Sequence, residues 1–216
     1  MNPIQRVRPS RGISPPLARR EVNDVATLRA MSDPLRLAIL RLLMQDADVE
    51  VRVMSAKEIA AELGEPQTKL YRHLKQLEDA QLIDVAETRV VSGIIEQRYR
   101  TAQLDVRLSP ELMKDTDAQS DVMTTIGAVI DDFRLELRRN VRANRVDLRP
   151  FADSESVGMI LQVGYARRMN VARAREFRDR LVELVTDFDD VPEDPNGTDV
   201  HMLIGWYGVP EHEPTA

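Results

Sequence analysis

The chain has 216 residues, of which 43% are hydrophobic and 31% charged, with a formal net charge of −6 and no cysteine. That composition is typical of a globular protein with one large domain or two small ones, and it leaves no thiol for a disulfide or a thiolate metal site. No apolar run reaches the roughly 18 residues that cross a bilayer, and no apolar segment follows the N-terminal arginines, so we expect a cytoplasmic protein without a secretory signal or a membrane partner.

Residues 1–20 differ from the rest of the chain. They contain four prolines, five arginines and no acid, with little to bury, so we expect a disordered basic arm. Its arginines could contact phosphates or a DNA minor groove, but a solvated leader is the simpler interpretation. The acidity of the remaining chain weighs little against DNA binding, because the field of a charge decays within about 10 Å at ordinary salt.

Two helices are predicted between residues 24 and 43. Asp33 is a good N-cap, and Pro34 suits the first helical position, where its missing N–H would have no partner in any case. Apolar residues recur at helical spacing on the face that we expect to be buried: Val25, Leu28 and Met31, then Leu35, Ile39 and Leu42.

A second pair of helices follows in SAKEIAAELGEPQTKLYRHLKQLEDAQLI, residues 55–83. Ser55 and Glu58 form a capping box, worth on the order of 1 kcal/mol. Gly64 should end the first of these helices, because glycine accepts the left-handed conformation at low cost, and Pro66 starts the second. The short connection predicts a helix-turn-helix, whose second helix turns these residues inward: Leu70, Leu74 and Leu77.

The outward face of that second helix is polar and basic. At 100° per residue it is centred on Thr68, Arg72 and Lys75, opposite the leucines. Such a helix, rich in hydrogen-bond donors, fits the DNA major groove, which is about 12 Å wide. The candidate DNA contacts on this helix are Gln67, Thr68, Lys69, Tyr71, Arg72 and Lys75.

Two β-branched runs come next. LIDVAETRVV and IIEQRYRT are separated by Ser92-Gly93, a signal for a tight turn, so they predict a β-hairpin. A hairpin directly after a recognition helix is a wing. Its arginines could reach phosphates or an adjacent minor groove, and we take as candidates Arg89, Arg98 and Arg100.

Residues 24–101 resemble the arsenic-repressor-type (ArsR-like) winged-helix regulators. The resemblance is carried by DPLRLAILRLL, by the helix-turn-helix stretch quoted above and by EQRYRT on the second wing strand. It implies a homodimer that represses or activates transcription, with one recognition helix per subunit in successive major grooves. It also implies that the helix beginning at Pro66 is the recognition helix.

The chain departs from that family at its metal sites. The metal sensors carry paired cysteines on the helix that here reads KEIAAELG, or Asp, His and Glu ligands near the end of the winged domain. This chain has no cysteine, and its only histidines, His73, His201 and His212, are not at ligand spacing. We therefore exclude thiolate metal sensing and predict no metal site and no cofactor; for His73, packing or a phosphate contact is the better interpretation.

A long helix is predicted within residues 106–150, starting at Ser109-Pro110. Arginines crowd its C-terminal turns, which suits the helix dipole and a solvated face. Its apolar stripe could supply a dimer contact or pack within the chain, and we favour the dimer contact. The stripe consists of Ile126, Ile130, Phe133 and Leu137.

The last segment, residues 151–216, reads as strand, helix and strand. The strands are SVGMILQVGYARRMN and VHMLIGWYGVP, and between them lies the amphipathic helix VARAREFRDRLVELVTDF, with Asn170 as its N-cap. We expect a small α/β subdomain that either extends a dimer interface or forms an effector pocket. The candidate pocket residues are Met159, Leu161, Tyr165, Met202 and Trp206.

Together these patterns predict an α+β protein. It would comprise a disordered basic arm at 1–20, a mainly helical winged helix-turn-helix domain at 21–105, a linking or dimerisation helix at 106–150 and an α/β subdomain at 151–216. The expected function is that of a homodimeric, sequence-specific transcriptional regulator that binds double-stranded DNA, with a small molecule as a possible effector. The alternative is a protein-interaction module. No glycine-rich phosphate loop or nucleophile motif is present, so we do not expect an enzyme.

Overall fold

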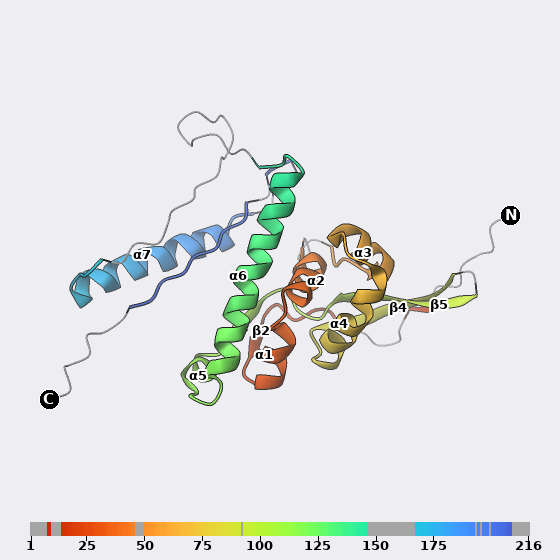
Figure 1. Ribbon diagram of the computed structural model, residues 1–216, viewed down its shortest axis with the longest axis horizontal. Coiled ribbons are helices and arrows are strands. Elements are labelled where there is room, and N and C mark those ends of the chain that lie inside the picture. The colour runs from red at the N-terminus through yellow and green to blue at the C-terminus, as the bar shows by residue number, and fades with distance from the viewer. Residues whose placement is uncertain are drawn as a thin grey trace. The chain divides into compact units, whose positions relative to one another are not determined.

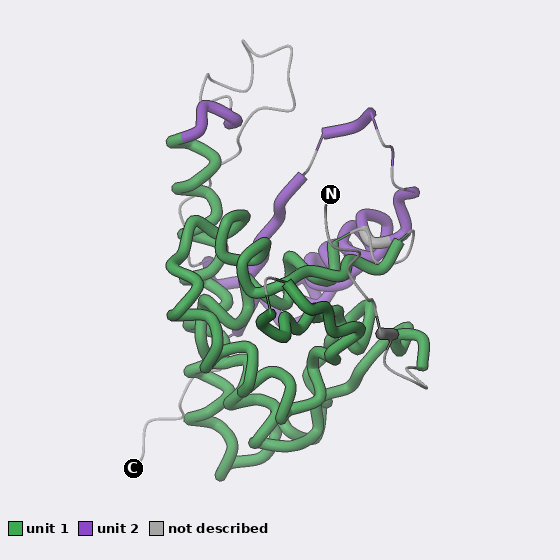
Figure 2. The backbone as a smooth tube through the Cα atoms, turned by 90° about the vertical axis from the view of Figure 1, so that its right-hand side faces the viewer, with its two compact units in different colours: residues 1–142 green, residues 143–216 purple. Residues whose placement is uncertain are grey.

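The computed structural model of the chain describes residues 8–9, 14–45, 50–91, 93–146, 167–192, 194, 196–198 and 200–208. The chain divides into two compact units, residues 1–142 (unit 1) and residues 143–216 (unit 2), coloured in Figure 2. Among the described residues, no helix is both long and apolar enough to cross a membrane.

Unit 1 contains six helices and six strands among its described residues (Figure 1). The helices are α1 Val25–Met31, α2 Pro34–Met44, α3 Ala56–Leu63, α4 Gln67–Asp79, α5 Pro110–Lys114 and α6 Gln119–Arg142. The strands are β1 Arg8–Pro9, β2 Arg20–Val22, β3 Met54–Ser55, β4 Ile83–Val91, β5 Ile94–Thr101 and β6 Val106–Leu108.

The helix ends follow the local sequence signals. The Asp33 carboxylate accepts hydrogen bonds from the backbone N–H groups of Leu35 and Arg36, which caps α2. Both hydrogen bonds of the Ser55–Glu58 capping box are present at the start of α3. Gly64 ends α3 in the left-handed conformation, at φ 65°. These predicted boundaries are confirmed.

The core of unit 1 lies between α2, α3, α4 and the base of the wing. The three inward leucines of α4 are fully buried, and they belong to the same cluster as Ile39 and Leu43 of α2 and Ile59 of α3: Leu70, Leu74 and Leu77. Because each is wholly removed from water, each contributes roughly 1.5–3 kcal/mol of burial. The helix-turn-helix is therefore held rigidly from its inner side.

The wing is the antiparallel hairpin of β4 and β5. Its register runs from Ile83↔Thr101 to Val91↔Ile94, with an irregularity between Val85 and Glu87. The predicted hairpin is confirmed. β3 extends the sheet beside β5 and β1 extends it beside β4, giving the strand order β1-β4-β5-β3.

The N-terminal segment is more ordered than the sequence indicates. Among its described residues, β1 pairs with β4 at Arg8↔Thr88, and Leu17 exchanges backbone hydrogen bonds with Ala102 and Leu104. β2 then pairs in parallel with β6. The expectation of a disordered arm over residues 1–20 is therefore corrected for residues 8–9 and 14–20, whose backbone groups find partners on the winged domain.

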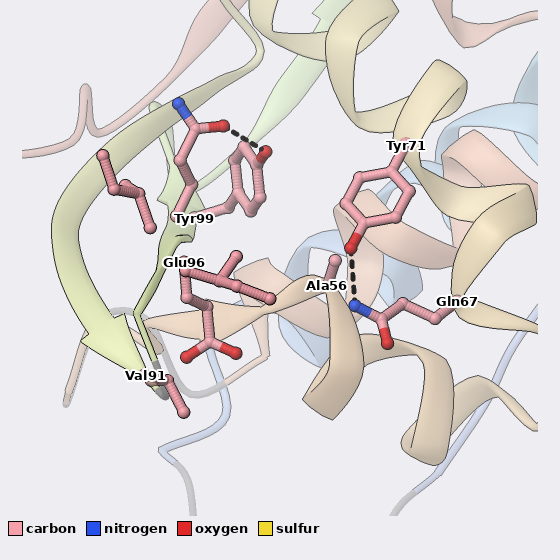
Figure 3. Close-up of a pocket in the computed structure, with 9 residues that line it drawn as sticks. Ala56, Gln67, Tyr71, Val91, Glu96 and Tyr99 are labelled. Carbon is pink, nitrogen blue, oxygen red and sulfur yellow. Dashed lines mark hydrogen bonds between the residues drawn. The ribbon is translucent and has the colours of Figure 1, made fainter.

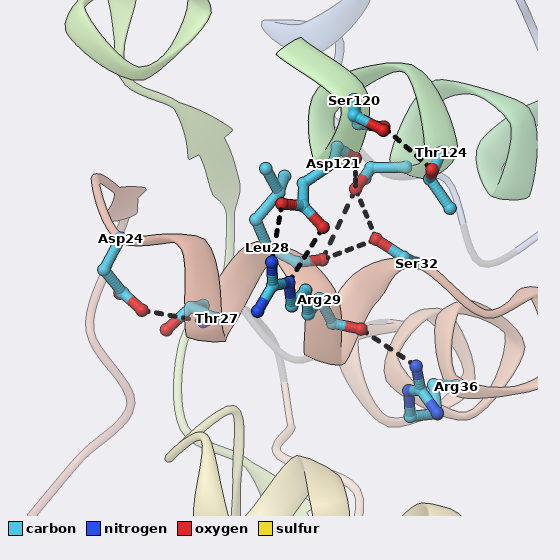
Figure 4. Close-up of polar contacts among 10 residues, drawn as sticks. Asp24, Thr27, Leu28, Arg29, Ser32, Arg36, Ser120, Asp121 and Thr124 are labelled. Atoms are coloured by element: carbon cyan, nitrogen blue, oxygen red, sulfur yellow. Dashed lines mark hydrogen bonds and ion pairs between the residues drawn. The ribbon is translucent and has the colours of Figure 1, made fainter. Parts of the chain in front are cut away.

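The long helix is part of the same unit as the winged domain. It is interrupted after α5, and α6 then packs against α1 and α2 with one face buried. Figure 4 shows the contact between α1 and α6, with Arg29 beside Asp121. The Arg29 guanidinium donates to the Asp121 carboxylate at 2.8 Å, and the hydroxyls of Ser32 and Thr125 lie 2.6 Å apart. Farther along α6, Arg41 of α2 forms ion pairs with Asp132 and Glu136.

Unit 2 has one helix among its described residues, α7 Val171–Asp189, capped by the Asn170 side chain as predicted. No strand is assigned within residues 200–208, and the strand–helix–strand arrangement stays a prediction. Most of the first predicted strand, together with Met159, Leu161 and Tyr165, lies outside the described residues.

Candidate nucleic-acid interface

The outward face of α4 is exposed along its whole length. Thr68, Lys69 and Tyr71 are exposed at its N-terminal end, and Arg72 and Lys75 continue the same face. Gln67, at the first position of the helix, is half-buried. The leucine face is buried in the core, so these side chains stand on a rigid support with their polar ends in solvent.

Most polar groups on this face have neighbours on the same helix or its N-terminal turn. The Lys69 ammonium lies 2.9 Å from the Glu65 carboxylate, and the Gln67 amide donates to the Tyr71 hydroxyl at 2.6 Å. Arg72 has no hydrogen-bond or ion-pair partner among the described residues. Its guanidinium therefore retains all its donors for a ligand.

Lys75 closes the face toward the C-terminal end of α4. Its ammonium lies 2.8 Å from the Asp79 carboxylate and 3.5 Å from that of Glu78. The hydrogen bond and the charge of Asp79, followed by the charge of Glu78, raise the pKa of Lys75. These acids make the C-terminal end of α4 less attractive to phosphate than its middle.

His73 belongs to the buried side of the same helix. Its Nδ1 lies 3.5 Å from the Asp33 carboxylate, the group that caps α2. Burial lowers the pKa of His73 below its ordinary value of 6.5, although the charge of Asp33 acts in the opposite direction. His73 thus packs α4 against the start of α2, which agrees with the packing interpretation from the sequence.

The three wing arginines are tied to acids of the same domain. Arg89 pairs with Glu87 at 2.6 Å, and Arg98 pairs with both Glu87 at 3.2 Å and Glu58 at 3.3 Å. Arg100 lies 3.5 Å from Asp84 and also donates to the carbonyl of Ser14. The side chains of Arg98 and Arg100 are only 14% and 12% exposed, so a contact with DNA would require these ion pairs to open.

The tip of the wing is apolar instead of basic. Ile94 and Ile95 are 72% and 71% exposed, and Val90 and Val91 beside them are also exposed. Arginines near a turn predict a phosphate contact. In the structure, however, acidic side chains on the same strands and on α3 pair with these arginines. That pairing depends on strand register, which the sequence alone did not provide.

A groove of about 460 Å³ lies between the wing tip and the start of α4. Figure 3 shows Gln67 and Tyr71 on one side and the wing residues on the other, with the Glu96 carboxylate among them. Helix α4 and the wing therefore face a common space.

The candidate effector pocket gains no support from the described part of unit 2. Met202 and Trp206 are 39% and 46% exposed, so neither is enclosed. Within the ranges that the structure describes, no three His, Asp or Glu side chains gather closely enough to hold a metal ion.

Arg20 was not among the predicted functional residues. Its guanidinium donates to the carbonyls of Gln81 and Ala80, at the end of α4, at 2.5 and 3.0 Å. It thereby links β2 to the end of α4. In the sequence, Arg20 is only one basic residue in a basic segment. That does not distinguish an arginine bonded to backbone carbonyls from a solvated one.

Comparison with known families agrees with this geometry. The family described as "Helix-turn-helix domain" matches residues 31–86, from the end of α1 to the first part of β4. No curated protein matches the chain. Residues 31–86 are thus a helix-turn-helix domain, the kind of domain that suggests DNA binding and transcriptional regulation.

Proposed function

We propose that the protein is a sequence-specific, DNA-binding transcriptional regulator of the ArsR-like winged-helix type, without catalytic activity. The observation that carries this proposal is the outward face of α4. It holds Arg72 without a partner in the described structure, between Lys69 and Lys75, on a helix whose other face is fully buried.

The chemistry of this face suits the edges of base pairs. An arginine can donate two parallel hydrogen bonds to guanine, and a glutamine can pair with adenine in the same way. Arg72 and Gln67 are the groups for these roles, each worth roughly 1–3 kcal/mol of discrimination against a wrong base. Lys69 would exchange Glu65 for a phosphate, because a single exposed ion pair is worth only about 0–1 kcal/mol.

The proposal includes a homodimer formed through α6. Beside its buried face, α6 carries an apolar seam spaced alternately by three and four residues: Met123, Ile126, Ile130, Phe133 and Leu137. Met123 and Ile130 are 64% and 49% exposed within the chain. Two such seams packed together would place two α4 helices on one DNA site, with half-sites about 34 Å apart.

The wing tip favours a second candidate function. An exposed apolar patch of isoleucine and valine, next to an arginine (Arg89) that is already paired with Glu87, suits a protein partner as well as a DNA groove. A winged-helix protein-interaction module is therefore the alternative.

The test is a selection of binding sites from a randomised duplex pool, at two salt concentrations. The wild type should enrich an inverted repeat. Arg72→Ala should weaken binding to it by about 5- to 150-fold, the equivalent of the 1–3 kcal/mol of one base contact. Arg145→Ala, which removes the same charge beyond the end of α6, should leave binding almost unchanged. No enriched sequence, or equal binding by wild type and Arg72→Ala, would contradict the proposal and favour a protein partner.

A further inference from the structure

Helix α7 has its charges distributed against its own dipole. Residues 167–180 hold six arginines and two acids, whereas residues 181–190 hold four acids and no base. The N-terminal end of a helix carries a partial positive charge and the C-terminal end a partial negative charge, so this order is unfavourable within one helix. The ion pairs Arg173–Glu176 and Arg178–Asp179 both lie within the basic half.

The same helix carries an apolar seam whose side chains are exposed or half-buried in the described structure. Residues spaced alternately by three and four form it: Ala174, Phe177, Leu181, Leu184, Phe188 and, just beyond the helix, Val191. This is the spacing of the a and d positions of a coiled coil. None of the described side chains of α7 is buried, and Leu184 and Val191 are 55% and 65% exposed.

We infer that α7 pairs in antiparallel orientation with α7 of a second copy of this chain. In that arrangement the layers of the seam match in size. Leu181 meets the second copy's Leu184 at the centre, Phe177 meets the second copy's Phe188 in the next layer, and the small Ala174 meets the second copy's Val191 at each end. The twofold axis that relates the two copies of α7 produces each of these contacts twice, so every seam residue has a partner on the other copy.

Charge selects the antiparallel orientation. The basic half of one helix then lies beside the acidic half of the other, and Arg180 and Asp187, which both flank the seam, form two equivalent ion pairs between the copies. A parallel pair would instead set Arg173 against the second copy's Arg178, and like charges in contact disfavour it. The Arg173 and Arg180 guanidinium groups already lie over the Phe177 ring, 4.8 and 5.8 Å from its centroid, and so flank the seam.

This contact is separate from DNA binding and from the α6 seam. A helix of 19 residues pairs weakly alone, but a second contact between the same two chains gains from their high effective concentration. Pairing of α7 therefore does not depend on DNA binding.

The test uses spin labels on the full-length protein without DNA. Because the chain has no cysteine, Ala172→Cys and Thr186→Cys each give a single labelling site, and both positions lie on the side of α7 away from the seam. In the antiparallel pair, the two copies of residue 172 are about 31 Å apart along the axis and those of residue 186 about 10 Å. A longer distance between labels at 172 than at 186 supports the pair, whereas equal distances, or none between copies, overturn it.

Charge variants test the ion pairs in the same assay, with the label at 186. Arg180→Asp or Asp187→Arg alone should abolish the short distance, and the double variant Arg180→Asp/Asp187→Arg should restore it. Arg175→Asp, an equal charge change on the outer side of α7, should retain the short distance. A double variant that stays unpaired would contradict the Arg180–Asp187 ion pair between the copies. DNA-site selection with the same variants reports separately on the proposed function.

Discussion

Arg20 and Arg19 are neighbouring arginines with different surroundings. Arg20 donates to two backbone carbonyls where α4 ends, whereas Arg19 is 58% exposed and pairs with Asp105 at the surface. Hydrogen bonds from a charged group to otherwise unsatisfied carbonyls are worth more than a surface ion pair. We expect Arg20→Ala to lower the free energy of unfolding by about 1–2 kcal/mol and Arg19→Ala by less than about 1 kcal/mol, measured by urea denaturation. Equal losses would show that Arg20 is not an anchor.

His73 gives the stability a dependence on pH. Burial lowers its pKa below 6.5 in the folded protein, so the unfolded chain binds more protons as the pH falls through that value. The free energy of unfolding should therefore be fully retained above about pH 6.5 and decrease below it. Lys69, Arg36 and Arg72 add positive charge nearby, and Asp33 opposes them without reversing the shift.

Urea denaturation at pH 7.5 and 5.5 checks this expectation. The two pH values bracket the ordinary pKa of histidine, whereas carboxylates with lowered pKa titrate in a more acidic range and contribute little to the difference. His73→Gln should make the two free energies more nearly equal than in the wild type. His201→Gln, at an exposed position, should keep the wild-type difference. A wild type with the same stability at both pH values would contradict the argument.

At the scale of elements, the helix-turn-helix depends on one glycine. Gly64 ends α3 at φ 65°, a conformation that costs other L-residues about 1–2 kcal/mol, and no atom crowds the position. Gly127 lies inside α6, equally open but with helical backbone, where alanine is preferred by about 0.5–1 kcal/mol. We expect Gly64→Ala to lower the melting temperature and Gly127→Ala to raise it. A fall in both, or a Gly64→Ala protein as stable as the wild type, would contradict this explanation.

The helix ends could be predicted from the sequence, whereas the short strands could not. Caps and helical periodicity are local signals, and Asp33, Ser55 and Gly64 marked the helix ends without knowledge of the fold. β1 and β2, of two and three residues, are too short for any period and form only because β4 and β6 offer free edges. The wing arginines were recognised as a group, but their partners depend on strand register and on the neighbouring Glu58 of α3.

At the scale of the whole molecule, the proposed regulator would need two copies to read a palindromic site, and α6 is the proposed first contact between them. Its inner face is used within the chain, through Val122, Thr125, Ala128 and Asp132. Its apolar seam is exposed at Met123, Ile126 and Ile130, and Ile130 lies at the middle of that seam. We expect Ile130→Asp to convert the dimer into a monomer, because a buried, unpaired carboxylate in a helix interface costs several kcal/mol.

Sedimentation velocity at micromolar concentration would measure that change. Thr124→Asp introduces the same charge on α6 outside the seam and should remain dimeric. Ile130→Asp should also bind a single half-site as well as wild-type protein does, since α4 is untouched, but it should lose the preference for half-sites one helical turn apart. If Ile130→Asp stays dimeric and still distinguishes that spacing, the α6 seam does not join the two copies, and the pairing of α7 would have to do so alone.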